Sequence, residues 1–223
     1  GQAPTEKHIR EIFADRAGAI APMFGAAEAA HPDCAGGDEA FEVLRAAGFL
    51  TSHLEKCQTR PQDVGPNVRA NVEEGLRYSL NDYARAAAAQ TKMYRAWQGF
   101  FAAHDVLITP AITVSPRPWK ELFPAEIDGQ PTRTYFHWLA LAYYPTLCGH
   151  PAISIPMGLD RNGMPFGLQV VGPRGGDRLV LGVAAAIEEA FVGDPLRCRP
   201  VPDLAKLKAA KPVKEMPGAV GWD

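Results

Sequence analysis

The sequence predicts an α/β fold in which a mixed β-sheet core is flanked by α-helices. Residues 148–158 and 163–172 are two apolar runs bounded by Gly and Pro, and the Asn-Gly pair between them favours a tight hairpin turn. Runs this apolar are typical of central strands that helices cover on both faces. Residues 178–191 follow with apolar side chains at helical spacing, and Asp177 is the predicted N-cap of that helix.

The first half of the chain is predicted to be mainly helical. Residues 5–20 carry an apolar stripe at helical spacing, with Thr5 as the expected N-cap. Residues 25–37 contain His-Pro and Gly-Gly pairs, which predict a short strand and a loop. Further helices are expected from Asp38 onward and near residues 67–77.

The clearest helix start is the Ser-Leu-Asn-Asp stretch at 79–82. Its Ser hydroxyl can accept the backbone N–H of the N3 residue, and its Asp side chain can accept the backbone N–H of the Ser. This capping box predicts a helix that runs from here to His104. An aromatic stripe on this helix, which includes Tyr83 and Trp97, could line a ligand cavity. A stripe at helical spacing usually belongs to the core, and we interpret it so.

A strand and a proline-rich loop are predicted next. Residues 106–109 form an apolar strand that Pro110 ends. The prolines in residues 113–124 forbid both helix and central strand, so this segment is expected to be an extended loop that borders a site. Its Trp119 and Phe123 could pack against the core or border a substrate channel, and the sequence favours neither alternative.

Two further segments flank the hairpin. Residues 132–147 are rich in aromatic side chains and predict a helix that Pro145 stops. Beyond Phe191 the chain is rich in Pro and Lys, so residues 193–223 are predicted to form an extended tail with a helical turn near 204–210.

Composition and charge exclude several classes of protein. The 223 residues are 47% hydrophobic and 22% charged, with a formal net charge of −2, so no electrostatic reason exists to expect nucleic acid. No apolar run approaches the ~18 residues of a membrane span. The four cysteines lack C-x-x-C spacing, which predicts free thiols, a cytoplasmic location, and neither a metal site nor a cofactor.

Two constellations that resemble active sites are rejected. His150 and Ser154 would share a face of a strand, but four extended residues span ~13 Å, so they cannot form a Ser-His pair. Ser154 is instead expected to lie in a buried strand and to donate to a neighbouring carbonyl. Residues 172–177 resemble a phosphate loop but lack its Lys-Ser/Thr ending, so a sharp turn is predicted there.

Two motifs of the hairpin carry a family resemblance. Gly-x-Pro-Ala-Ile-Ser-x-Pro-x-Gly at 149–158 and Gly-x-Pro-x-Gly-Leu-Gln-x-x-Gly at 163–172, with Asp-Val-Leu-Ile-Thr-Pro at 105–110, resemble the C-terminal part of amidase signature enzymes. The resemblance extends from about residue 4 to 191. It implies amide hydrolysis by acyl transfer through a Ser-Ser-Lys triad.

The triad of that family has no counterpart in this chain. In the family it lies in an earlier Gly/Ser-rich stretch, whereas this chain has four serines, none of them in such a run. Residues 1–223 are therefore expected to be the C-terminal portion of an amidase-signature domain, inactive alone and without catalytic residues. Its expected partners are a small-molecule amide and the missing N-terminal half. A homo-oligomer is also possible, because the absent first strand would expose a sheet edge.

The resemblance also names candidate substrate-binding residues and one competing function. Family members line the acyl or leaving-group pocket from the helix at 132–147, where Trp138, Ala142 and Pro145 would share an apolar face suited to an apolar or aromatic amide. These three residues could equally be core. In glutamine-dependent amidotransferase A-type subunits an acidic residue stands where this chain has Leu139, so we rank that function lower. A non-catalytic binding or scaffold half-domain is the third alternative.

Overall fold

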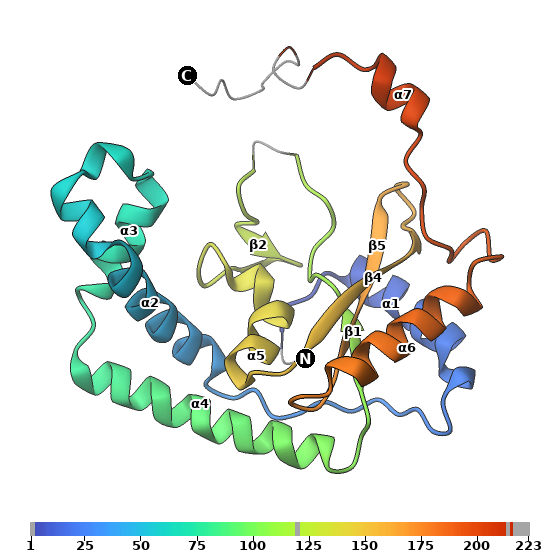
Figure 1. Cartoon of the computed structure of the whole chain (residues 1–223), viewed down its shortest axis with the longest axis horizontal. Helices are drawn as coiled ribbons and strands as arrows, with labels where there is room; N and C mark the ends of the chain where they lie inside the picture. Colours follow the sequence, from blue (N-terminus) through green and yellow to red (C-terminus); the bar gives the residue numbers. More distant parts are fainter. Residues whose placement is uncertain (1–2, 119–120, 213–214, 216–223) are drawn as a thin grey trace.

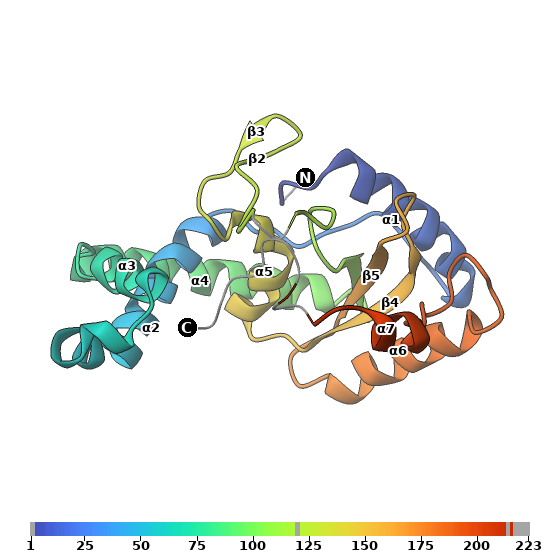
Figure 2. The same cartoon turned by 90° about the horizontal axis from the view of Figure 1, so that it is seen from above.

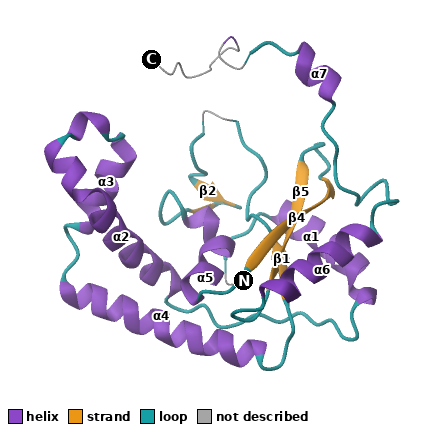
Figure 3. Cartoon of the chain, in the orientation of Figure 1, coloured by secondary structure: helices purple, strands orange, loops and turns teal. Residues whose placement is uncertain are grey.

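The computed structural model describes residues 3–118, 121–212 and 215 of the chain, and its elements form a mixed α/β fold (Figure 1, Figure 3). The α-helices are α1 Lys7–Ile20, α2 Gly37–Thr59, α3 Pro66–Gly75, α4 Leu80–Phe101, α5 Ala140–Cys148, α6 Asp177–Ala190 and α7 Leu204–Ala209. The strands are β1 Leu107–Pro110, β2 Glu126–Ile127, β3 Gln130–Pro131, β4 Ala152–Leu159 and β5 Pro165–Val171. Three 3-10 turns, η1 Ala21–Met23, η2 Pro61–Asp63 and η3 His137–Leu139, complete the described elements.

The predicted hairpin is confirmed as strands β4 and β5. They pair antiparallel, with Ile155 opposite Leu168, and Gly163 in the turn has a φ of 75°. Strand β1 pairs antiparallel with the other edge of β5, so the described sheet has the order β1-β5-β4. Strand β5 is therefore the central strand, and Leu168 and Val170 are fully buried.

Helices lie on both sides of the central strand β5 (Figure 2). Leu168 and Val170 point to one face, where they form a core cluster with Ile9 of α1 and Ile187 of α6. Val171, on the opposite face, belongs to a second cluster with side chains of α4 and α5. Because successive residues of a strand point to opposite faces, β5 contributes to both cores.

The expectation that both hairpin strands are covered on both faces is wrong for β4. Ile155 and Met157 of β4 are buried, but Ala152 and Ser154, which point the other way, are exposed. Strand β4 forms the edge of the described sheet, and the side chains on its second face are uncovered at Ala152 and Ser154. Ser154 is consequently not the buried strand residue that the sequence predicted.

The helix starts agree in part with the predicted caps. Ser79 and Asp82 form the predicted capping box, with the Asp82 N–H donating to Ser79 Oγ at 3.2 Å. Helix α1 begins after Glu6 rather than Thr5, and Gly176 rather than Asp177 precedes α6. Residues 25–34 form no regular element, so the short strand expected there is absent.

The core face of α4 differs from the predicted stripe by one position. Trp97 is buried as expected, but Tyr83 is 46% exposed. The side chains that pack inward with Trp97 are Ala86 and Met93. Both faces of α4 carry enough apolar residues to form a core face. Packing against α2 and α5 determines which of them is buried.

The aromatic segment before the hairpin is only partly helical. A helix was predicted over residues 132–147, but α5 starts at Ala140 and the 3-10 turn η3 precedes it. Pro145 lies inside α5 and does not stop it; the helix ends at Gly149, which has a φ of 66°. Glycine accepts this left-handed conformation without strain, so it provides the C-cap.

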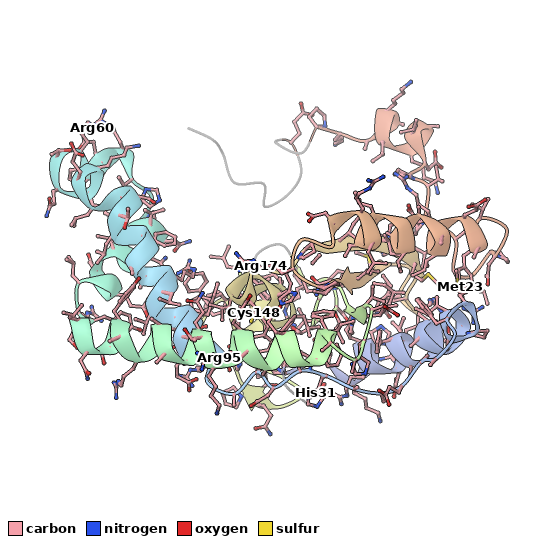
Figure 4. All side chains as sticks on the ribbon, turned by 60° about the horizontal axis from the view of Figure 1, so that its bottom comes forward. Met23, His31, Arg60, Arg95, Cys148 and Arg174 are labelled. Atoms are coloured by element: carbon pink, nitrogen blue, oxygen red, sulfur yellow. The ribbon has the colours of Figure 1, made fainter. Side chains whose placement is uncertain are left out.

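Helices α2 and α3 form an arm that projects away from the sheet (Figure 1), and Arg60, just after α2, lies near its tip (Figure 4). At the other end of the molecule, helix α7 lies in the Pro- and Lys-rich segment, within the range where a helical turn was predicted. None of the described helices is long and apolar enough to cross a membrane.

The end of β4 generates a stability prediction. Gly158 has a φ of 79°, and a Cβ at this position would lie 2.0 Å from the carbonyl oxygen of Leu196. We expect Gly158→Ala to lower the free energy of unfolding by about 2 to 4 kcal/mol, from backbone strain plus the clash. Urea unfolding measures this value.

Gly163→Ala is the matched control for Gly158→Ala. Gly163 has a similar φ of 75°, but a Cβ added there would meet no atom within 4 Å, so its substitution should cost only the strain of about 1 kcal/mol. Equal losses for the two variants would show that the contact with Leu196 contributes nothing.

Candidate functional site

A cavity of about 290 Å³ lies beside the hairpin and is mainly apolar. One wall is the proline-rich segment after β1, a second is the turn that carries Trp138, and a third is formed by the hairpin and α1. The lining residues are Ile9, Ile112, Val114, Ser115, Pro116, Arg117, Pro118, Glu121, Leu122, Phe123, Pro124, Trp138, Asp160, Pro165, Phe166 and Gly167.

Glu6, at the start of α1, is hydrogen-bonded to the proline-rich wall of the cavity. Its backbone N–H donates to the carbonyl of Thr113 at 2.8 Å, and its carboxylate accepts the N–H of Ser115 at 2.8 Å. Arg117 lies between two carboxylates, 3.4 Å from Glu6 and 3.1 Å from Glu121. These contacts hold an extended segment that prolines keep out of helix and sheet.

Trp138 lines the cavity, and its polar groups are already hydrogen-bonded. Its indole Nε1 donates to the carbonyl of Tyr135 at 2.9 Å, and its own carbonyl accepts the hydroxyl of Thr113 at 2.6 Å. Thr113 is fully buried. Since the indole N–H and the carbonyl are both satisfied, the ring acts as an apolar wall.

The three residues predicted to bind substrate do not line the cavity together. Trp138 lines it, whereas Ala142 is exposed and Pro145 is buried, and neither belongs to the lining. The shared-face argument assumed one helix, but Trp138 precedes α5 in the 3-10 turn. Phe123 lines the cavity and is 43% exposed, while Trp119 is outside the described residues.

Sequence reasoning missed Asp160, a carboxylate on the cavity wall. Asp160 Oδ1 accepts the backbone N–H groups of Asn162 and Met164, both at 2.8 Å, and Oδ2 lies 3.2 Å from His8 Nε2. Burial raises the pKa of Asp160, but the Met164 and Asn162 N–H groups and His8 outweigh it, so the pKa lies below its usual value. The Asp-x-Asn-Gly turn pattern could have indicated the two backbone bonds.

His150 and Ser154 form no catalytic pair, as predicted. His150 is buried, with Nδ1 2.8 Å from the carbonyl oxygen of Gly172 and Nε2 3.1 Å from the side-chain nitrogen of Gln98. Burial lowers the pKa of His150. It therefore fastens α4 to the loop after β5 as a neutral imidazole.

Two of the four cysteines are unreactive thiols. None of the four forms a disulfide, and burial raises the pKa of Cys34 and of Cys148 to about 12 in each case. A thiol with so high a pKa stays protonated and is a poor nucleophile. In the described part of the chain, no group of three or more His, Cys, Asp or Glu could hold a metal ion.

Asp160 gives a pH prediction. A carboxylate whose pKa is lowered by folding stabilises the folded state above the unfolded-state pKa of ~3.9, and this contribution is lost as the pH falls toward the folded-state value. We expect the free energy of unfolding at pH 7 to be about 1 to 3 kcal/mol higher for the wild type than for Asp160→Asn. Urea unfolding between pH 3 and 7 should show the difference shrinking on acidification; a difference independent of pH would contradict the assignment.

Comparisons with known proteins identify the family to which these features belong. The amidase family profile matches residues 34–181. A 2-amino-5-chloromuconic acid deaminase from Comamonas testosteroni is 29% identical over 178 residues, which are 78% of this chain and 37% of the deaminase. The A-type subunit of the glutamyl-tRNA(Gln) amidotransferase from Nocardia farcinica is 34% identical over 64% of this chain and 29% of its own length.

Solved structures show the same fold. The crystal structure of an amidase superposes with a TM-score of 0.76 at 21% identity, over 84% of this chain and 43% of the amidase. The chain thus spans less than half the length of the proteins that it matches.

Proposed function

The chain belongs to the amidase signature family, and from this membership we propose that it is part of an amide hydrolase whose substrate lies against the Trp138 cavity. One observation carries the proposal: the cavity is bounded by Gly167 of the family's hairpin motif and by the proline-rich loop after β1. Loops at strand ends are common positions for binding sites.

The cavity chemistry supports an apolar or aromatic amide as the substrate class. Its walls are mainly Pro, Phe, Trp and aliphatic side chains. The guanidinium of Arg117 already faces Glu6 and Glu121, so the described lining residues offer no unpaired cation to a carboxylate substrate. An apolar acyl or leaving group would gain its binding energy from burial against Trp138 and Phe123.

The catalytic residues are proposed to lie outside this chain. Within the described residues, Ser115 lines the cavity, but no Lys or His lines it beside Ser115. Acyl transfer in a Ser-Ser-Lys triad needs a Lys to deprotonate the bridging Ser, which activates the nucleophilic Ser, while backbone amides stabilise the oxyanion. This chain would supply the core and a pocket wall to those groups.

The outer edge of β4 supports a partner that supplies further strands. Gly172 N–H donates to the carbonyl of Pro151 at 3.0 Å, so alternation turns the backbone groups of Ala152 and Ser154 away from β5. Both residues are exposed and sit on an open edge of the described sheet. We propose that the rest of the enzyme pairs with this edge; a second copy of the chain would satisfy the same groups.

A glutamine-dependent amidotransferase of the A type is the second candidate, because such a protein is among the relatives. In such subunits an acidic residue on the segment before the hairpin holds the ammonium group of glutamine, because a buried ammonium needs an anion beside it. The chain has no Asp or Glu between Gln130 and Gly149, and Leu139 is 36% exposed where the acid is expected. Hydrolysis of an apolar amide is therefore the preferred function. A reducing, cytoplasmic setting is proposed because none of the four cysteines forms a disulfide.

The first functional prediction is that the purified chain has no amidase turnover, because no Ser and Lys meet at the cavity among the described residues. The measurement is release of product from a panel of aryl and aliphatic amides. Turnover that a serine-directed covalent inhibitor abolishes would contradict the prediction, because it would require a nucleophile within this chain.

The second functional prediction concerns Trp138 in the complete enzyme. Trp138→Ala should change the ratio of kcat/KM between bulky and small amides by about tenfold, the range that one pocket contact supplies. Leu139→Ala, a neighbour that does not line the cavity, is the control. An unchanged ratio with a large fall in Tm would assign Trp138 to the core.

A further inference from the structure

We propose that Asp38, on the first turn of α2, is a positioning residue that holds Trp138 against the cavity. Asp38 contacts the chain on both sides of Trp138, and it does so from an element that does not itself line the cavity. Only the consequence for substrate rests on the proposed function; the positioning of Trp138 does not.

The contacts of Asp38 after Trp138 are two hydroxyl groups of α5. Tyr143 and Tyr144 donate to Asp38 Oδ1 at 2.6 Å and 2.8 Å. Both tyrosines are buried, and burial together with the Asp38 carboxylate raises the pKa of each hydroxyl. The hydroxyls therefore remain protonated donors, and charge-assisted bonds of this length are among the stronger hydrogen bonds in proteins.

The contact of Asp38 before Trp138 is with His137. His137 Nδ1 accepts the backbone N–H of Arg133 at 3.1 Å, so the ring proton is on Nε2, which lies 3.4 Å from Asp38 Oδ2. This distance places the His137 ring in contact with the Asp38 carboxylate. Trp138 is the next residue along the chain, so the position of His137 affects the 3-10 turn that carries Trp138.

Other contacts hold the same turn to the arm but do not reach Trp138 so directly. Arg133 lies 2.6 Å from Glu42 and 2.7 Å from Glu39 of α2. Phe41 stacks on the Tyr143 ring with centroids 4.2 Å apart. Phe41 also contacts Phe136, before Trp138, with ring centroids 5.4 Å apart. The helical arm and the Trp138 turn consequently behave as one packed unit, in which Asp38 is a polar group that contacts both flanks of Trp138.

Fluorine NMR of the chain labelled with 5-fluorotryptophan tests the proposal. The sequence has four tryptophans, and Trp138→Phe assigns the resonance of Trp138. Asp38→Ala removes all three contacts and should shift or broaden that resonance. Asp38→Asn keeps an oxygen for the two tyrosines but removes the carboxylate's charge, so a smaller change is expected.

Glu28→Ala is the matched control. Glu28 also holds a histidine, with its Oε1 2.7 Å from His104 Nε2, and neither residue lines the cavity. This variant should leave the Trp138 resonance unchanged. If Asp38→Ala does not fold, the Trp138 resonance is measured in Asp38→Asn and in Tyr143→Phe, which removes one donor to Asp38. A change in that resonance is expected in both variants.

Binding of benzamide to the same samples separates positioning from function. We expect Asp38→Ala to weaken benzamide binding by about threefold to tenfold, the range of one hydrogen bond's net contribution. A Trp138 resonance that is identical in wild type and in the folded Asp38 variants would overturn the proposal, even if their Tm falls. No benzamide binding by wild type, with the resonance change present, would support positioning and contradict the proposed function instead.

Discussion

Burial of β5 on both faces is the constraint on which the rest of the described fold depends. Leu168 and Val170 require α1 and α6 on one side, and Val171 requires α4 and α5 on the other. Gln169, between them, is satisfied by donating to the carbonyl of Leu141 at 2.9 Å. A strand paired along both edges can be this apolar because its backbone groups bond to β1 and β4 and its side chains are covered.

The polar groups near the hairpin join segments that are distant in the sequence. Arg16 of α1 is buried; its Nε donates to the carbonyl of Met157 at 3.0 Å, and its Nη2 donates to that of Leu159 at 3.1 Å. These bonds lie at the irregular end of β4, where the pairing with β5 changes register. Asp160 performs a similar task one residue later, between the hairpin turn and His8. The cavity adjoins the second of these contacts, because Asp160 lines it together with Ile9 of α1 and Phe166 of the hairpin.

The helical arm affects the cavity although it lies outside it. Helix α2 has a polar link through Asp38 and an aromatic link through Phe41, and both end on the segment that includes η3 and α5. Trp138 is on that segment. Substitutions in the arm can therefore alter the cavity without touching its lining, because packed elements move as units.

The sequence by itself determined the features that depend on near neighbours. These are the hairpin with Gly163 in its turn, the capping box at Ser79, and the family motifs that place the chain among amidases. Tertiary structure alone decided that Trp138 lies in a 3-10 turn and that Asp160 shares its cavity, because Thr113 and the hairpin hold these residues from distant parts of the chain. The spacing of apolar residues predicts a buried face only if the segment is a regular helix. Contacts between residues more than twenty positions apart determine which face is buried and which side chains lie together.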